Sequence, residues 1–60
     1  MTYRIHVIGR DGHALRTEAA DCADDKEAID RATQIANGHD VEIWDHKRFV
    51  TRLPGNLPKA

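Results

Sequence analysis

One segment of the chain has the apolar spacing of an α-helix, and the segments on both sides of it alternate as β-strands do. Ala28, Ile29, Ala32, Ile35 and Ala36 form a single apolar stripe with a period of 3.6 residues. A helix of this length is unstable alone in water, so the stripe must pack against another layer. In a chain of 60 residues, which allows one domain, the flanking strands have to supply that layer.

The helix has recognisable start and stop signals. Asp24 is a good N-cap, and Glu27 follows it three residues later, as in a capping box. At the other end, Asn37 is followed by Gly38, a residue suited to the left-handed conformation after the last turn. The sequence therefore predicts a helix over residues 25–37.

The strand segment before the helix begins at residue 3. Tyr3, Ile5 and Val7 point to one face of a predicted strand over residues 3–9, because successive side chains of a strand alternate. Arg10-Asp11-Gly12 can form a three-residue hairpin loop, since Gly12 adopts a positive φ without steric cost. A hairpin is the expected structure.

Two registers of this hairpin can be compared, because loop length sets the register. A two-residue Asp11-Gly12 loop places Val7 opposite Arg16 and Ile5 opposite Glu18, which sets apolar side chains against charged ones. We therefore expect the three-residue loop, whose register gives the pairs Val7–Leu15, Ile5–Thr17, Tyr3–Ala19 and Arg4–Glu18.

A second hairpin is predicted after the helix, from residues 41–44 and 48–53. Loops of two or four residues both place Trp44 opposite Phe49 and Ile43 opposite Val50. Two prolines, a glycine and no periodicity follow, so we expect a single domain over residues 1–53 and a flexible tail over residues 54–60.

These elements predict a small α+β domain with the order β-β-α-β-β, a mainly antiparallel four-stranded sheet and one helix on one face. A right-handed crossover gives the strand order 2-1-3-4; the order 1-2-3-4 is the alternative. The large apolar side chains expected between helix and sheet are Tyr3, Ile5, Val7, Leu15, Ile29, Ile35, Val41, Ile43 and Val50.

The face of the sheet away from the helix is the candidate interaction surface. It should carry Trp44 and Phe49, two of the three aromatic residues in the chain, and a small domain that exposes them usually uses them at an interface. A chain this small, with no disulfide, also gains stability from a second copy. We expect binding to another protein, or a homodimer, through a surface comprising Arg4, His6, Ile8, Arg16, Trp44 and Phe49, beside Glu18, Glu42 and Thr51.

Catalytic and metal chemistry have weak support in the sequence. The potential metal ligands His6, His13, His39, His46 and Cys22 lack a recognised ligand spacing. No nucleophile motif, phosphate-binding loop or nucleotide fingerprint is present. We therefore expect a protein that is not an enzyme and uses no metal, cofactor or small-molecule substrate.

Nucleic acid is the alternative partner. The basic residues Arg4, Arg10, Arg16, Lys47, Arg48 and Arg52 lie in the strands and turns. A sheet with arginine and aromatic side chains can stack bases and contact phosphates. Glu18 and Glu42 argue against this, as do the net charge of −1 and a pI of about 6.4.

The expected location is the cytoplasm. Cys22 is the only cysteine, so it forms no internal disulfide, and the N-terminus lacks the apolar region of a signal peptide. No apolar run is long enough to cross a membrane.

Several short motifs are distributed along the chain: Tyr3-Arg4, Asp11-Gly12, Cys22, Asp24-Asp25, Glu27-Ala28, Gly38, Val41-Glu42, Trp44 and Arg48. Together they resemble a group of short uncharacterised proteins from rhizobia-type bacteria. The resemblance covers roughly residues 3–53 and implies a bacterial domain, without implying an activity. Where the group usually has a glycine in the last hairpin, this chain has Asp45-His46-Lys47.

A second likeness is to the N-terminal half of HicB-type antitoxins. Those proteins also run from a tyrosine-containing strand through a hairpin to a helix with a Glu-Ala pair, here Glu27-Ala28. This sequence lacks their Pro- and Gly-containing segment before the helix and their DNA-binding extension. The resemblance implies an antitoxin-like regulator as a further alternative.

Overall fold

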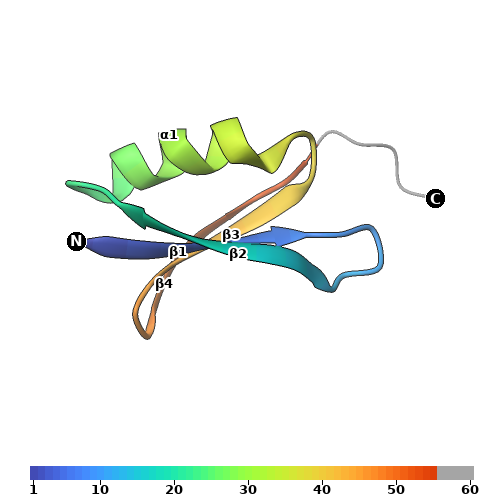
Figure 1. Cartoon of the computed structure of the whole chain (residues 1–60), viewed down its shortest axis with the longest axis horizontal. Helices are drawn as coiled ribbons and strands as arrows, with labels where there is room; N and C mark the ends of the chain where they lie inside the picture. The colour runs from blue at the N-terminus through green and yellow to red at the C-terminus, as the bar shows by residue number, and fades with distance from the viewer. Residues whose placement is uncertain (56–60) are drawn as a thin grey trace.

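The computed structural model describes residues 1–55 and has the element order predicted from the sequence. Four strands and one helix form a small α+β domain, with the helix across one face of the sheet (Figure 1). Within these residues no helix has the length and apolarity needed to cross a membrane. The elements are β1 (Thr2–Ile8), β2 (Ala14–Asp21), α1 (Asp25–Ala36), β3 (Asp40–Asp45) and β4 (Arg48–Leu53).

The sheet has the strand order β2-β1-β3-β4, and every neighbouring pair is antiparallel. The order 2-1-3-4 is confirmed and the alternative 1-2-3-4 is wrong. Helix α1 carries the chain from edge strand β2 over the sheet to β3, which pairs with β1. The two edges of the sheet are therefore β2 and β4.

The core lies between α1 and the two central strands. Tyr3, Ile5 and Val7 of β1 and Val41 and Ile43 of β3 are buried there, as predicted. Ala28 and Ala32 contribute the fully buried part of the helix stripe, because their small side chains let the helix approach the sheet closely. The larger residues at the margin of this layer, Ile29, Ile35, Ala36, Val50 and Leu53, are only partly buried.

Both ends of the helix follow the local signals. Asp24 is the N-cap, and its Oδ1 accepts a hydrogen bond of 2.9 Å from the backbone N–H of Glu27. The helix ends at Ala36, one residue before the predicted end, because Asn37 already has a left-handed conformation with φ 51°. Gly38 follows with φ 86°, so two successive residues turn the chain into β3.

The loop of the first hairpin is confirmed. The N–H of Gly9 donates to the carbonyl oxygen of His13 at 2.7 Å, which closes the three-residue loop. Gly12 has φ 87°, the positive value that this loop requires. Asp11 accepts a hydrogen bond from the backbone N–H of His13, and this contact lowers the pKa of the Asp11 carboxyl group.

The predicted register beyond that loop is wrong, because β2 contains a β-bulge. Ile8 is opposite Ala14, but Val7 is opposite Arg16, so Leu15 is an extra residue with no partner on β1. Leu15, predicted in the core, is 59% exposed. From Val7 to Thr2 the strands follow the register expected for a two-residue loop, with Ile5 opposite Glu18.

Arg16 and Glu18 consequently lie on the helix side of the sheet, and their predicted place on the open face is wrong. Charged residues are tolerated there because β2 is an edge strand, so both side chains reach solvent at the margin of the core. They are 56% and 43% exposed, and Arg16 Nε lies 3.0 Å from Glu18 Oε2. The register therefore places no isolated charge in the core.

The second hairpin also contains a bulge. Trp44 is opposite Phe49, as predicted, but Ile43 is opposite Thr51, not Val50. Val50 is the extra residue, and Thr51 shares the helix side with Ile43, so its predicted place on the open face is wrong. His46 takes a positive φ of 55° in the two-residue loop, where a glycine is usual.

The chain after β4 remains close to the domain for at least two residues. The backbone N–H of Gly55 donates to a carboxylate oxygen of Asp40, at the start of β3. The rest of the predicted flexible tail, residues 56–60, lies outside the described residues.

Candidate interaction surface

The open face of the sheet brings together four of the six residues predicted to form the interaction surface. Arg4 and His6 of β1 lie on this face beside Trp44 of β3, and Phe49 of β4 lies opposite Trp44. Ile8 is 8% exposed, too buried to contribute much contact area. Arg16, the sixth residue, belongs to the helix side.

Trp44 and Phe49 form an edge-to-face aromatic pair. Their ring centroids are 5.3 Å apart and the ring planes are inclined by 73°. Phe49 is 50% exposed, one of three large apolar side chains with high exposure among the described residues. No described element covers this face, since α1 packs on the opposite one (Figure 1). The pair is thus a preformed apolar site next to solvent.

A network of charged side chains borders the aromatic pair. Arg52 of β4 donates to Glu42 Oε2 at 2.7 Å and to Asp40 Oδ2 at 3.1 Å. Trp44 Nε1 donates to Glu42 Oε1 at 3.3 Å, so the indole orientation is coupled to the network. The hydrogen bond to Asp40 and the contact with Glu42 raise the pKa of the Arg52 guanidinium, which stays charged.

Arg4 and His6 lie in the middle of the face with different surroundings. His6 Nδ1 lies 2.8 Å from Thr17 Oγ1 of the neighbouring strand β2. Arg4 is exposed and lies between Ala19 and Trp44 in the register. Within residues 1–55, its guanidinium makes no hydrogen bond or ion pair, in contrast to Arg52.

A second polar cluster ties the helix N-terminus to the sheet. The hydroxyl of buried Tyr3 donates to Asp25 Oδ1 at 2.7 Å. Arg48 donates to both carboxylate oxygens of Asp25, at 3.0 and 3.3 Å, and to Asp45 at 3.1 Å. The Arg48 and Tyr3 hydrogen bonds lower the pKa of Asp25, and the Asp25 contact raises the pKa of Tyr3 to about 12. The lowered pKa keeps Asp25 ionised and the raised pKa keeps Tyr3 neutral, so the hydrogen bonds between the helix start and the sheet are retained at neutral pH.

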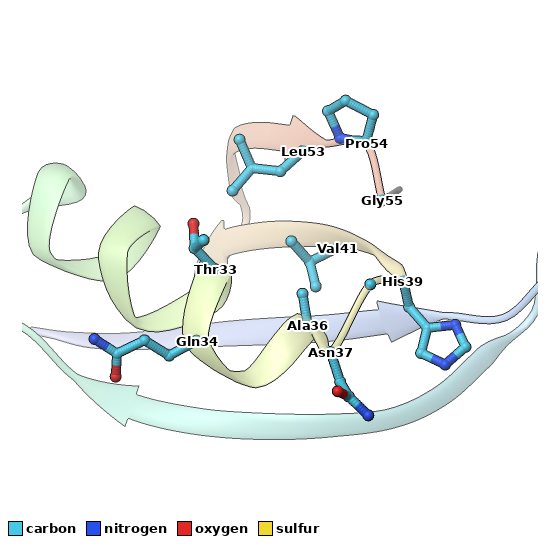
Figure 2. A pocket seen from close by; sticks show the side chains of 10 residues that line it. Thr33, Gln34, Ala36, Asn37, His39, Val41, Leu53, Pro54 and Gly55 are labelled. Carbon is cyan, nitrogen blue, oxygen red and sulfur yellow. The ribbon is translucent and has the colours of Figure 1, made fainter. Parts of the chain in front are cut away.

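A groove of about 410 Å³ lies at the other end of the helix. Figure 2 shows that its lining comes from the last turn of α1, the start of β3 and the end of β4. Val41 and Leu53 supply apolar surface, and His39 is the one titratable side chain among the described lining residues.

The potential metal ligands are scattered. Over residues 1–55, no group of three or more His, Cys, Asp or Glu side chains is arranged to hold a metal ion. Cys22 is buried as a free thiol, and His13 Nδ1 lies 3.2 Å from Asp11 Oδ2 in the first loop.

Comparisons with known proteins add no relative: no family model, curated protein or solved structure matches the chain.

Sequence reasoning missed three contributors to the open face. It did not place Asp40, Arg52 or Thr17 there. The bulges at Leu15 and Val50 explain part of this, because each moves the residues beyond it to the other face. Asp40 was overlooked because it precedes the apolar alternation that marks β3.

Proposed function

We propose that this protein acts by binding, without catalysis, and that it docks another protein through the open face of its sheet. The observation that carries the proposal is the edge-to-face pair of Trp44 and Phe49, on a face that no described element covers. Phe49 is half exposed and Trp44 is partly buried. Aromatic side chains and arginines are enriched where proteins bind one another. Arg4 adds a cation directly beside the pair.

The charges of the face favour a particular kind of protein partner. Both acidic side chains beside the aromatic pair are already held by Arg52, whereas Arg4 has no partner among the described residues. A partner that presents a carboxylate next to an apolar side chain would satisfy Arg4 and cover Phe49. A second copy would bring to Arg4 carboxylates that Arg52 already holds, so we favour a different protein at this face.

Nucleic acid is the second candidate for this surface. The aromatic pair and Arg4 are suited to base stacking and phosphate contact. Asp40 and Glu42 lie within the same face and repel phosphates, which makes this candidate the weaker one. Binding to nucleic acid should fall steeply as salt concentration rises.

The proposal includes a bacterial cytoplasmic location. It is supported by the resemblance to short bacterial proteins and by the state of Cys22, a buried free thiol and the only cysteine in the chain.

The fluorescence of Trp44, the only tryptophan, allows a direct test. The protein is titrated with a peptide of alternating Leu and Glu, and with a matched peptide of alternating Leu and Lys. We expect a blue shift and saturable binding with the acidic peptide only. Arg4→Glu should reverse this preference, and Phe49→Ser should weaken binding of the acidic peptide.

Lys26→Glu, on the exposed side of α1, is the matched control for Arg4→Glu and should leave binding unchanged. Equal responses to the two peptides, or none, would overturn the proposed surface chemistry. Salt-sensitive binding of a mixed single-stranded oligonucleotide, lost in Arg4→Glu, would favour nucleic acid instead.

A further inference from the structure

The outer edge of β2 is an eight-residue strand edge with no neighbour among the described residues. The direction of its free backbone groups follows from one hydrogen bond. The N–H of Cys22 donates to the carbonyl oxygen of Met1, so the backbone N–H and C=O groups of Cys22 point toward β1. Because backbone groups alternate in direction along an antiparallel strand, those of Glu18 also point toward β1, and those of Thr17 and Ala19 point outward.

We propose that two copies of this chain pair through their β2 edges, antiparallel, with Thr17 opposite Thr17 of the second copy. Only outward-pointing residues can exchange hydrogen bonds across the new edge, so in the regular part of β2, residues 16–21, odd-numbered residues must face odd-numbered ones. Pairing about Thr17 meets that requirement. It joins the two sheets into one of eight strands with both helices on the same side.

The charges of β2 select this register. With Thr17 opposite Thr17, Arg16 of each copy lies opposite Glu18 of the other, which gives two reciprocal opposite-charge pairs. A shift of two residues sets Glu18 against Glu18, or Arg16 against Arg16. Pairing about Ala19 sets Glu18 opposite Ala20 and leaves the charges unmatched. Only the Thr17 register is self-complementary, as a two-fold interface must be.

The same register accounts for two exposed features of the strand. Arg16 and Glu18 form an ion pair of 3.0 Å within the chain and are about half exposed on the same side of the sheet. In the dimer, each can therefore exchange this partner for the opposite charge of the second copy. Leu15, the extra residue of the bulge, directly adjoins the paired residues and is 59% exposed, so a second copy at this edge can cover it.

The other edge of the sheet does not offer this complementarity. Strand β4 carries only basic charges, Arg48 and Arg52, so no register of two β4 edges sets opposite charges against each other. The helix packs mainly over β3 and β1, so it leaves the β2 edge accessible. The proposal uses neither Trp44 nor Phe49 and is independent of the function proposed for the open face.

The test uses charge reversal with two variants. In Glu18→Arg, residues 16 and 18 are both arginine; in Arg16→Glu, both are glutamate. Each variant alone should be monomeric by sedimentation at concentrations where the wild type dimerises, because like charges then face one another. An equimolar mixture should form a heterodimer, since every facing pair becomes opposite in charge. Pairing along one short strand buries little surface, so we expect a dissociable wild-type dimer.

A second measurement needs no variant, in case Arg16→Glu fails to fold. In wild-type protein, the Thr17 amide should become protected from hydrogen exchange as concentration rises, while the inward Glu18 amide is protected throughout. Phe49→Ser should leave dimerisation intact. A strict monomer with a rapidly exchanging Thr17 amide would overturn the proposal, and so would a dimer that survives both charge reversals but is lost in Phe49→Ser.

Discussion

Arg16 of edge strand β2 donates a hydrogen bond from Nη2 to the backbone carbonyl oxygen of Ile35, in the last turn of α1, at 3.1 Å. The last turn of the helix contains no basic residue of its own. A cation near a helix C-terminus stabilises the negative end of the helix dipole and satisfies free carbonyls. The charge that the helix sequence lacks is thus provided by a strand.

Replacing Arg16 should therefore destabilise the helix end. We expect Arg16→Ala to lower the free energy of unfolding by about 0.5–1 kcal/mol, and Arg16→Lys by less, since Lys keeps the charge. Urea denaturation at low protein concentration measures this for the monomer. Arg31→Ala, at an exposed helix position, is the control and should change stability little. Equal effects at residues 16 and 31 would show that the Ile35 contact contributes nothing.

The N-cap at Asp24 gives a second prediction. Asp24→Ala should cost about 1 kcal/mol, because the backbone N–H of Glu27 loses its acceptor. Asp24→Asn should retain most of the stability, since asparagine caps helices about as well. The urea midpoint with an unchanged m-value is the measurement. A midpoint in Asp24→Ala equal to that of the wild type would argue against the cap.

Substitutions in the core should cost more stability at the centre of the helix–sheet layer than at its margin. Ile43 is fully buried, so Ile43→Val should cost about 1 kcal/mol through the lost methylene group. Ile35 is only partly buried, and Ile35→Val should cost clearly less. Thermal unfolding of the two variants compares them directly; similar losses would mean that Ile35 packs as tightly as Ile43.

Acid should weaken the contact between the helix start and the second hairpin. The Arg48 and Tyr3 hydrogen bonds lower the pKa of Asp25 below its ordinary value of 3.8. The stabilisation is therefore complete above pH 3.8 and is lost as the pH falls through the lower folded-state pKa. Asp25→Asn should reduce the fall in Tm on acidification, whereas Asp30→Asn, at an exposed helix position, should leave it as in the wild type.

Alkaline pH should destabilise the folded state by ionising Tyr3. Its pKa is raised from 10.0 to about 12, chiefly by the hydrogen bond to Asp25. The neutral phenol thus stabilises the folded state fully below pH 10, and this contribution is lost as the pH rises toward 12. Tyr3→Phe should have a lower Tm than wild type at pH 7 and a shallower decline between pH 10 and 12. Parallel pH profiles would show that Tyr3 ionises normally.

The candidate surface was predictable in part. The alternation of Trp44 with the buried residues of β3 places it on the open face, and the short loop brings Phe49 opposite it. The place of Arg16 was not predictable, because it depends on a bulge that no turn residue marks. Arg4 is visible in the sequence, but its lack of a partner depends on which acidic residues Arg52 binds.

The element order, the N-cap at Asp24 and the loop of the first hairpin follow from residues close together in the chain, and so they could be predicted. The register beyond the two bulges depends on packing between segments that are distant in the chain. The choice between Leu15 and Arg16 as the residue opposite Val7 depends on β2 being an edge strand. There Arg16 can reach both solvent and the carbonyl of Ile35, and so it occupies a side that local alternation assigns to apolar residues.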